Sequence, residues 1–283
     1  MKISIIMRSK DEMPYVKYTL MMFKKQTIQD YELLVVDSGS TDGSWELAQE
    51  YAPDIAYQIR PQDYIPGKVM NAAATKCSGD ILVFNNADCI PQDEHWLANL
   101  IKPFEDPEVI AVFGNQITRP DATPIIQKDY ERAFGDGKIH SKWRHFFSMA
   151  TSAVRRSVWE EFPFFEEIQY SEDIEWSWRM KQMGKKIVYV PDAIVEHSHN
   201  YNLKQTIKRF KGEGKAEAYI YGEDNRNVVS DILVPAFKES VRDFFYLLRK
   251  GELLWIAKAP VYRILQRYGI WKGKEEYLSA YKT

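Results

Sequence analysis

ELLVVDSGSTDGSWELAQEYA, residues 32–52, predicts a strand, a turn and a helix in direct succession. The apolar run ELLVVD is short and is followed by turn formers, which is typical of a buried strand. SGSTDG supplies small residues and helix N-cap candidates, and SWELAQEYA continues as a helix. A strand that turns directly into a helix is the repeating unit of a parallel α/β sheet.

The same alternation of short apolar runs and helical stretches continues on both sides of residues 32–52. Further strands are expected at KISIIM (2–7), IAYQI (55–59), DILVFN (80–85), VIAVFG (109–114), KKIVYVP (185–191) and AIVEHSH (193–199). Further helices are expected at 15–23, 67–77, 93–104 and 170–184, with loops and short helices between 115 and 165. The predicted fold class is therefore α/β, with a mainly parallel sheet covered by helices on both faces.

Composition and charge are those of a soluble globular protein. The 283 residues are 45% hydrophobic and 28% charged, with a formal net charge of −2, so nothing supports nucleic-acid binding. Cys77 and Cys89 lack metal-site spacing, and we expect two buried thiols in a reducing compartment. The apolar run before Arg8 is too short for a signal peptide, and no run reaches about 18 apolar residues. We expect a cytoplasmic protein, with the inner face of the cell membrane as an alternative.

Polar residues gather where the predicted strands end. Open α/β sheets bind ligands beyond the carboxyl ends of their strands, so these side chains are expected to converge on one site. The residues at such ends are Met7, Arg8, Asp37, Ser38, Asn86, Ala87, Asp88, Gly114 and Asn115.

Asp88 is the lone acid of VFNNADCIP, residues 83–91. One carboxylate can hold a divalent cation when a nucleoside diphosphate supplies further oxygen ligands. An imidazole from His197 or His199, in EHSHN, would complete the site and favours Mn²⁺ over Mg²⁺. The alternative is an ordinary turn, because Asn, Asp and Pro are common where strands end.

Glu172 and Asp173 open the predicted helix at 170–184. Acids in a first turn interact favourably with the helix dipole, which is the structural interpretation. The functional interpretation is a general base that accepts a proton from a sugar hydroxyl. Adjacent helical residues point about 100° apart, so one acid would face the substrate. Arg179 or Lys181 would hold the other, and spacing does not choose between the two acids.

Three further residues are candidates for nucleotide contacts. Asp37, followed by SGSTDG, would accept a hydrogen bond from a nucleobase N–H; a plain strand-to-helix turn is the alternative. Lys68 and Asn71 share a face of the helix at 67–77 and would reach ribose or phosphate, although a surface lysine is the default.

The ordered set of motifs resembles family 2 glycosyltransferases from residue 1 to about 205. It comprises SIIMRSKDE, ELLVVDSGSTDGSWELA, GKVMNAA, ILVFNNADCIP, YSEDIEW and VEHSH. Two longer stretches further resemble the bacterial rhamnosyltransferase branch, which builds surface polysaccharides. They are DEHWLANLIKPFEDPEVIAVFGNQITRPDATP and VEHSHNYNLKQ. The resemblance implies a GT-A fold and inverting transfer of a sugar from a nucleotide-diphosphate donor to a saccharide or lipid-linked saccharide acceptor.

The resemblance also implies roles for individual residues. Asp37 would contact the base, Asp88 a divalent metal and Asp173 would be the catalytic base, with His197 before His199 as the metal ligand. The donor site would comprise Arg8, Asp37, Ser38, Lys68, Asn71, Asn86 and Ala87. Glu172, Gly114, Asn115 and Trp176 would support the acceptor side. The chain departs from the family pattern at Asn86, where an Asp is usual, and at MRSKDE in the opening strand.

Two other classes compete with this interpretation. A nucleotidyltransferase also combines a parallel α/β sheet with a metal-bound nucleotide, but MRSKDE lacks the glycine-rich basic loop expected there. A non-catalytic nucleotide-sugar-binding protein is favoured only by Asn86. Release of nucleoside diphosphate rather than pyrophosphate, and donor hydrolysis without acceptor, would separate the three.

The predicted catalytic domain covers residues 1–205, and a helical extension covers 206–283. The extension carries an apolar stripe with helical spacing within 229–248, followed by a basic, aromatic segment at 253–274. For the stripe we favour packing on the catalytic domain or on a second copy of the chain. For residues 253–274, contact with an anionic membrane and packing both stay open.

Overall fold

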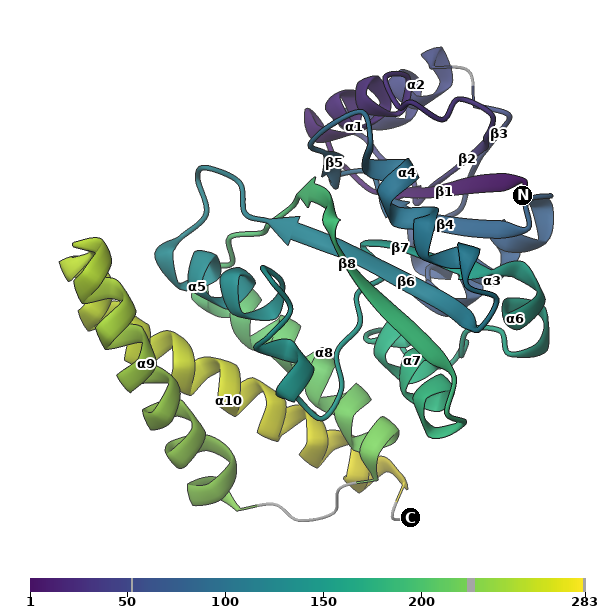
Figure 1. Ribbon diagram of the computed structural model, residues 1–283. Helices are drawn as coiled ribbons and strands as arrows, with labels where there is room; N and C mark the ends of the chain where they lie inside the picture. The colour runs from purple at the N-terminus through teal and green to yellow at the C-terminus, as the bar shows by residue number, and fades with distance from the viewer. Residues whose placement is uncertain (52, 223–226, 282–283) are drawn as a thin grey trace. The chain divides into compact units, whose positions relative to one another are not determined.

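The computed structural model describes residues 1–51, 53–222 and 227–281, which form two compact units (Figure 1). The sheet unit comprises Met1–Arg119, Arg132–Ile168 and Glu172–His197. The helical unit comprises Pro120–Glu131, Gln169–Ser171 and Ser198–Thr283. The boundary predicted at residue 205 stays a prediction, since both units draw on more than one stretch of the chain.

The sheet unit is built on one eight-stranded sheet of order β3-β2-β1-β4-β7-β6-β8-β5. The pairs β3·β2, β2·β1, β1·β4 and β6·β8 are parallel, whereas β4·β7, β7·β6 and β8·β5 are antiparallel. The strands are β1 (Ile3–Ser9), β2 (Glu32–Asp37), β3 (Ile55–Gln58), β4 (Ile81–Asn86), β5 (Ile90–Pro91), β6 (Val109–Ile117), β7 (Thr151–Arg155) and β8 (Lys186–Glu196). The sheet is mixed, with parallel pairs in the majority.

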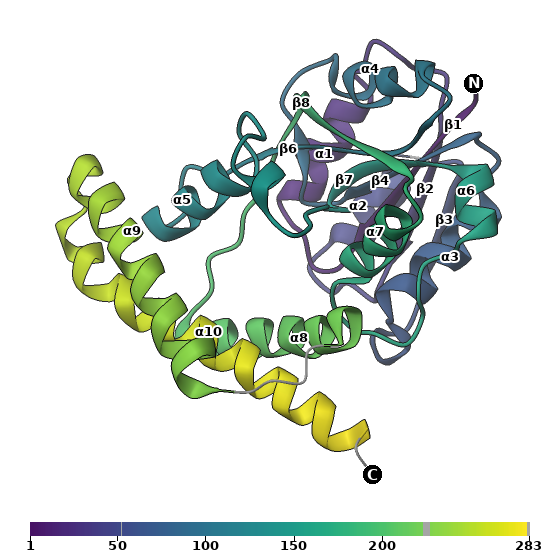
Figure 2. The ribbon, with the colours of Figure 1, turned by 60° about the horizontal axis from the view of Figure 1, so that its bottom comes forward.

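Helices cover both faces of this sheet, as the alternation of the sequence predicts (Figure 2). Alternate residues of β1 separate the two cores: Ile5 lies in the core of α1, α2 and α4, and Ile6 in the core of α3, α6 and α7. These helices are α1 (Tyr15–Phe23), α2 (Ser44–Glu50), α3 (Pro66–Lys76), α4 (Trp96–Ile101), α6 (Arg156–Glu161) and α7 (Glu172–Gln182). Short 3₁₀ turns are η1 (Pro61–Asp63), η2 (Lys102–Glu105) and η3 (His140–Lys142).

Three sequence-based expectations about the strands are wrong. The central strand β7 lies in the 115–165 segment expected to be irregular. KKIVYVP and AIVEHSH form one strand, β8, whose pairing with β6 shifts register between Gly114 and Asn115. β6 therefore continues to Ile117, and Gly114 lies inside it rather than at its end. A Cβ at Gly114 would meet Ala193 O at 2.5 Å, so glycine permits this close approach.

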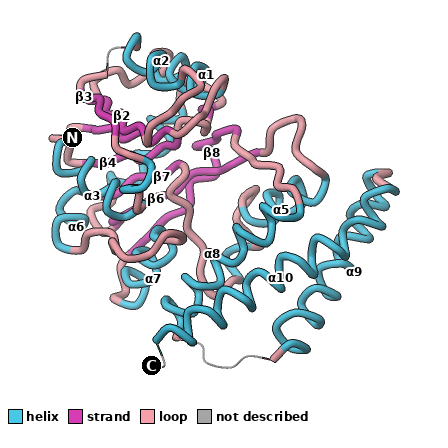
Figure 3. The backbone as a smooth tube through the Cα atoms, turned by 180° about the vertical axis from the view of Figure 1, so that it is seen from behind, coloured by secondary structure: helices cyan, strands magenta, loops and turns pink. Residues whose placement is uncertain are grey.

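The helical unit contains α8 (Leu203–Tyr221), a π-helical turn η4 (Val229–Leu233), α9 (Val234–Lys250) and α10 (Leu253–Tyr281), together with most of α5 (Pro124–Ala133) (Figure 3). Asn202 caps α8 through a reciprocal capping box with Gln205. α8 and α10 pack so closely that a Cβ at Gly214 would lie 2.1 Å from Ile270 O. Among the described helices, none is long and apolar enough to cross a bilayer.

Candidate active site

The carboxyl ends of β1, β2 and β4 meet because these strands are parallel neighbours, as expected from the sequence. Asp37 pairs with the last residue of β1, and Arg8 pairs with Asn86. The Ser38 N–H donates to the last residue of β1, and the Ala87 N–H donates to Arg8 O, each at 2.9 Å. The loops that follow β2 and β4 therefore leave the sheet on either side of β1.

Arg8 connects the end of β4 to the start of α7. Its Nε donates to Asn86 Oδ1 at 2.7 Å, and its Nη1 donates to Glu172 Oε1 at 2.9 Å and to Tyr64 OH at 3.3 Å. Burial alone would lower the pKa of Arg8, but the nearby Tyr64 and Glu172 outweigh it and raise that pKa. The buried Glu172 is thus held as one half of an ion pair.

The basic partner predicted for this acid pair is therefore wrong. Arg179 instead binds Glu175, one turn earlier on α7, through Nε and Nη2 at 2.6 and 3.0 Å. Lys181 donates to the backbone oxygen of Arg144. Sequence spacing suggested partners within α7, whereas the actual partner of Glu172 comes from β1.

Asp173, next to Glu172, is held by backbone donors and is only partly exposed. Its Oδ2 accepts from Met149 N at 3.0 Å, and its Oδ1 accepts from Ile174 N at 2.8 Å. Burial, and then the charge of Glu172, raise the pKa of Asp173 to about 6, against the two backbone hydrogen bonds and Arg8. A carboxylate with such a pKa is ionised at neutral pH and is a stronger base than a typical aspartate.

Asp88 and His197 bring an oxygen and a nitrogen together between β4 and the end of β8. His197 Nδ1 lies 2.7 Å from Gln116 Oε1, and Gln116 Nε2 donates to Ser148 Oγ at 2.8 Å. Because Gln116 Oε1 is an acceptor, Nδ1 carries the imidazole proton and Nε2 presents its lone pair. That Nε2 lies 3.4 Å from Asp88 Oδ2. The two side chains therefore fit a divalent cation, with Gln116 orienting the imidazole.

Cys89 is a third potential ligand at this position. The Cys89 Sγ, a carboxylate oxygen of Asp88 and a ring nitrogen of His197 all lie within 4.8 Å of one another. Burial, and then the charge of Asp88, raise the pKa of the Cys89 thiol, which disfavours a thiolate ligand here. Both cysteines are free and buried, as expected, and Cys89 directly follows the predicted ligand Asp88 in the chain.

Two charged residues near Asp88 were missed by the sequence analysis. Arg119 Nη2 donates to Asp88 O at 2.8 Å and to Asp88 Oδ2 at 3.0 Å, and its guanidinium stacks 3.5 Å above the Tyr15 ring. Burial, and then the charge of Asp88, raise the pKa of Glu12 to about 8. Arg119 follows β6 in the segment expected to be irregular. Glu12 lies in the MRSKDE departure, which was the one available signal.

Asp37 organises the loop that follows β2. Its Oδ1 accepts from Gly39 N, Ser40 N and Gln58 Nε2 at 2.8–2.9 Å, and its Oδ2 accepts from the Ser40 hydroxyl at 2.5 Å. These contacts fit the turn interpretation of Asp37. They also leave Oδ2, which accepts a single hydrogen bond, able to accept another from a nucleobase. Lys68 is exposed on α3.

Three predicted site residues serve the protein interior instead. Asn71 Nδ2 donates to Phe164 O and to a glutamate, and Asn71 Oδ1 accepts from Trp159 Nε1 and Phe164 N, which leaves no position for ribose or phosphate. Trp176 is fully buried and donates to a backbone oxygen, so it is part of the core. Asn115 is buried inside β6 and donates to Pro191 O on β8.

His199 belongs to the helical unit, where its ring stacks on that of Tyr201 with centroids 5.9 Å apart. His197 belongs to the sheet unit together with Asp88. The geometry described for Asp88 supports His197 as the imidazole ligand.

Comparison with known proteins shows the family of the chain. The chain matches the family described as Glycosyl transferase family 2 over residues 4–164. It is 31% identical over 225 residues to the O-antigen chain rhamnosyltransferase RfbN of Salmonella typhimurium, covering 76% of this chain and 72% of that protein. It is 35% identical over 205 residues to the O-antigen chain rhamnosyltransferase WbaN of Salmonella anatum, covering 68% and 64%.

Solved structures share the fold at low sequence identity. The mannosyltransferase PcManGT of Pyrobaculum calidifontis, in complex with GDP-Man and Mn²⁺, has a TM-score of 0.68 at 18% identity, covering 99% of this chain and 88% of that chain. Glucosyl-3-phosphoglycerate synthase of Mycobacterium tuberculosis has a TM-score of 0.59 at 17% identity, covering 79% and 80%. The fold is the GT-A fold, and the family match decides against a nucleotidyltransferase. The chain belongs to glycosyl transferase family 2.

Proposed function

We propose that this glycosyltransferase moves a sugar, with rhamnose as the first candidate, from a nucleoside-diphosphate donor to a hydroxyl of a saccharide or lipid-linked saccharide. Rhamnose is suggested by RfbN and WbaN, whose names state that they transfer it. One observation carries the proposal. The sheet unit contains both a partly exposed Asp173 with a raised pKa and an Asp88–His197 pair whose atoms suit a divalent cation.

Asp173 is the proposed catalytic base. Its two oxygens each accept one backbone hydrogen bond, so each retains a lone pair for an acceptor hydroxyl. Asp173 takes the hydroxyl proton while that oxygen forms a bond to the anomeric carbon. The bond from that carbon to the diphosphate oxygen breaks and the electron pair leaves with the nucleoside diphosphate. A single displacement of this kind inverts the anomeric configuration.

Asp88 and His197 would hold a divalent cation, and the imidazole favours Mn²⁺ over Mg²⁺. Such a cation supplies electrostatic stabilisation of the charge that develops on the leaving diphosphate. Asn86 has no charge to offer it, and its Oδ1 is already bound by Arg8. The protein therefore contributes Asp88 and His197 as the main ligands, and the diphosphate oxygens would complete the coordination.

Arg8 is a proposed phosphate contact. It is partly exposed, and its guanidinium is fixed by Glu172, Tyr64 and Asn86 in the group of side chains at the end of β1. A fixed guanidinium can bind phosphate oxygens without losing further side-chain freedom. Without an acid at residue 86 the protein holds the cation with one ligand fewer. The positive charge of Arg8 would compensate by binding the diphosphate of the donor directly.

A direct transfer assay tests the proposal. The full chain is incubated with Mn²⁺ and with UDP-, dTDP- or GDP-linked sugars, including a rhamnose donor, and the released nucleotide and the anomeric product are identified. Asp173→Asn is expected to leave donor affinity near normal and to abolish transfer, while the exposed Asp192→Asn changes neither. Turnover retained by Asp173→Asn would remove this residue as the base, and pyrophosphate release would overturn the reaction type.

A further inference from the structure

The helical unit buries charged side chains and exposes apolar ones. In α9, Asp243 is fully buried, whereas Phe237 is 70% exposed and Phe245 is 61% exposed. Soluble helices normally show the opposite pattern, because apolar area gains most from leaving water. Of the two packing partners expected for the 229–248 stripe, the catalytic domain does not cover most of it, and packing on a second copy of the chain stays a prediction.

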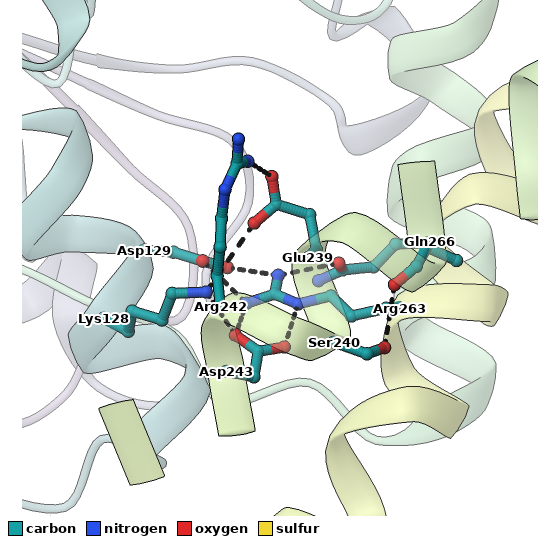
Figure 4. A network of polar contacts seen from close by, with 9 residues as sticks. Lys128, Asp129, Glu239, Ser240, Arg242, Asp243, Arg263 and Gln266 are labelled. Carbon is teal, nitrogen blue, oxygen red and sulfur yellow. Dashed lines mark hydrogen bonds and ion pairs between the residues drawn. The ribbon is translucent and has the colours of Figure 1, made fainter. Parts of the chain in front are cut away.

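A network of ion pairs fixes which side of α9 and α10 faces inward (Figure 4). Asp243 accepts from Arg263 Nε and Nη2 at 2.7 and 2.8 Å and also pairs with Lys128. Arg263 binds Asp129 with two further hydrogen bonds at 2.7 and 2.8 Å. These contacts link α5, α9 and α10 within the helical unit, so neither α9 nor α10 can rotate its apolar side inward without breaking buried ion pairs.

The outward side carries exposed apolar side chains from both helices, which we call the apolar face. Between α9 and α10 it forms a groove of about 480 Å³, in which Ser240 is the single polar lining residue. The exposed members of the apolar face are Leu233, Val234, Phe237, Val241, Phe244, Phe245, Leu248, Leu253, Leu254, Val261 and Ile264. A surface of this extent on a soluble chain marks an interaction site.

Positive charge borders one edge of the apolar face. Residues 234–268 contain seven basic and three acidic residues, a net charge of +4 in a chain whose total is −2. At 100° per residue, the exposed Lys238, Arg242 and Arg249 fall along one edge of the α9 stripe, where Arg242 pairs with Glu239. Within the described part of the chain, Lys238 and Arg249 form no ion pair. The exposed Lys258 carries the same charge onto α10.

We propose that the apolar face docks on an anionic lipid bilayer surface, with α9 and α10 lying in the interface plane. An apolar stripe bordered by lysine and arginine is the pattern that inserts into the headgroup boundary while its cations meet anionic lipids. A second copy of the chain fits less well. A two-fold interface whose axis crosses α9 would bring the two basic edges together, and one whose axis runs along α9 would leave both edges at the rim; neither gives the cations an anionic partner. This inference concerns α9 and α10 alone and does not depend on the proposed function.

Co-sedimentation of the full chain with vesicles tests the proposal. Binding is expected to vesicles that contain phosphatidylglycerol, to weaken at high salt, and to be much weaker to pure phosphatidylcholine. Phe237→Glu combined with Phe245→Glu is expected to abolish binding. Lys238→Gln combined with Arg249→Gln is expected to lower the partition coefficient about 30-fold, from two lost basic contacts. Two matched controls should bind as the unaltered chain does. Met183→Glu changes an exposed apolar residue outside α9, and Lys17→Gln combined with Lys25→Gln removes two exposed lysines outside α9.

Circular dichroism and light scattering separate the remaining outcomes. The α9 variants alter exposed side chains only, so their helix content should match that of the unaltered chain. Absence of vesicle binding by the folded, unaltered chain would overturn the proposal. A concentration-dependent dimer that Phe237→Glu and Phe245→Glu dissolve would also overturn it, in favour of a second copy. Equal binding to neutral and anionic vesicles would refute the charge-selective surface that we propose.

Discussion

Replacing Glu172 by glutamine removes the negative charge next to Asp173 while retaining an acceptor for Arg8. Burial is the main cause of the raised pKa of Asp173, about 6, and the charge of Glu172 is the second. Arg8, freed of its anionic partner, would then stabilise the ionised Asp173 more strongly. Both changes act in the same direction, so the pKa of Asp173 is expected to fall towards its ordinary value of 3.8.

The effect has a definite size in a pH–rate profile. A base must be ionised to act, so with a pKa of about 6 roughly a tenth of Asp173 is active at pH 5. If glutamine at residue 172 lowers the pKa to about 5, roughly half is active at that pH. The ratio of kcat/KM at pH 5 to that at pH 8 would then rise about fivefold. Absolute kcat/KM can fall as well, since Arg8 loses an ion pair, but the ratio isolates the titration.

The assay measures initial rates of sugar transfer with a fixed donor between pH 5 and pH 8. Glu175→Gln is the matched control, because it removes a buried acid of the same helix whose partner is Arg179. The control should leave the acidic limb of the profile near pH 6. An acidic limb that stays at the same pH in Glu172→Gln, or moves to higher pH, would refute the assignment of Asp173 as the base or the charge coupling between the two acids.

Three other changes have expected outcomes. Gln116→Leu should lower Mn²⁺ affinity 10–100-fold in calorimetry with the donor diphosphate present, because His197 loses the partner that orients it, and an unchanged affinity would contradict the ligand role. Asp243→Asn should destabilise the protein by about 3–5 kcal/mol in urea unfolding, because Arg263 and Lys128 would lose the fully buried anion that they share and keep only Asp129 and Glu239; Glu252→Gln is the control. Trp176→Ala should lower the free energy of unfolding by about 3–5 kcal/mol, because it empties a buried position. If the variant instead keeps its stability and only its KM for the acceptor rises, Trp176 supports the acceptor side as the sequence predicts.

Local patterns in the sequence predict the strand–helix alternation and the meeting of Arg8, Asp37 and Asn86. Such patterns succeed because a buried strand and an amphipathic helix each carry their own periodicity, and because parallel neighbours end at the same edge. β7 escaped prediction since TSAVR is short and is defined by antiparallel pairing with β4 and β6, which are distant in the chain.

Side-chain partners far apart in the sequence could not be predicted. Arg8 and Glu172 are 164 positions apart, so helical spacing suggested Arg179 or Lys181 for a contact that comes from the sheet. Asparagine often contacts ligands, yet the Asn71 side chain accepts hydrogen bonds from Trp159 Nε1 and Phe164 N. It therefore holds the backbone that follows α6. Residue type limits what a side chain can do, while the fold decides which partner it meets.

The ion pair between Arg119 and Asp88 has a consequence for the order in which ligands bind. Arg119 donates to Asp88 Oδ2, the same oxygen that faces His197, so a bare cation approaching that oxygen meets a resident positive charge. A cation that arrives with a nucleoside diphosphate brings anions to which the guanidinium can turn. We expect metal and donor to bind cooperatively, with the free ion held weakly until the diphosphate is present.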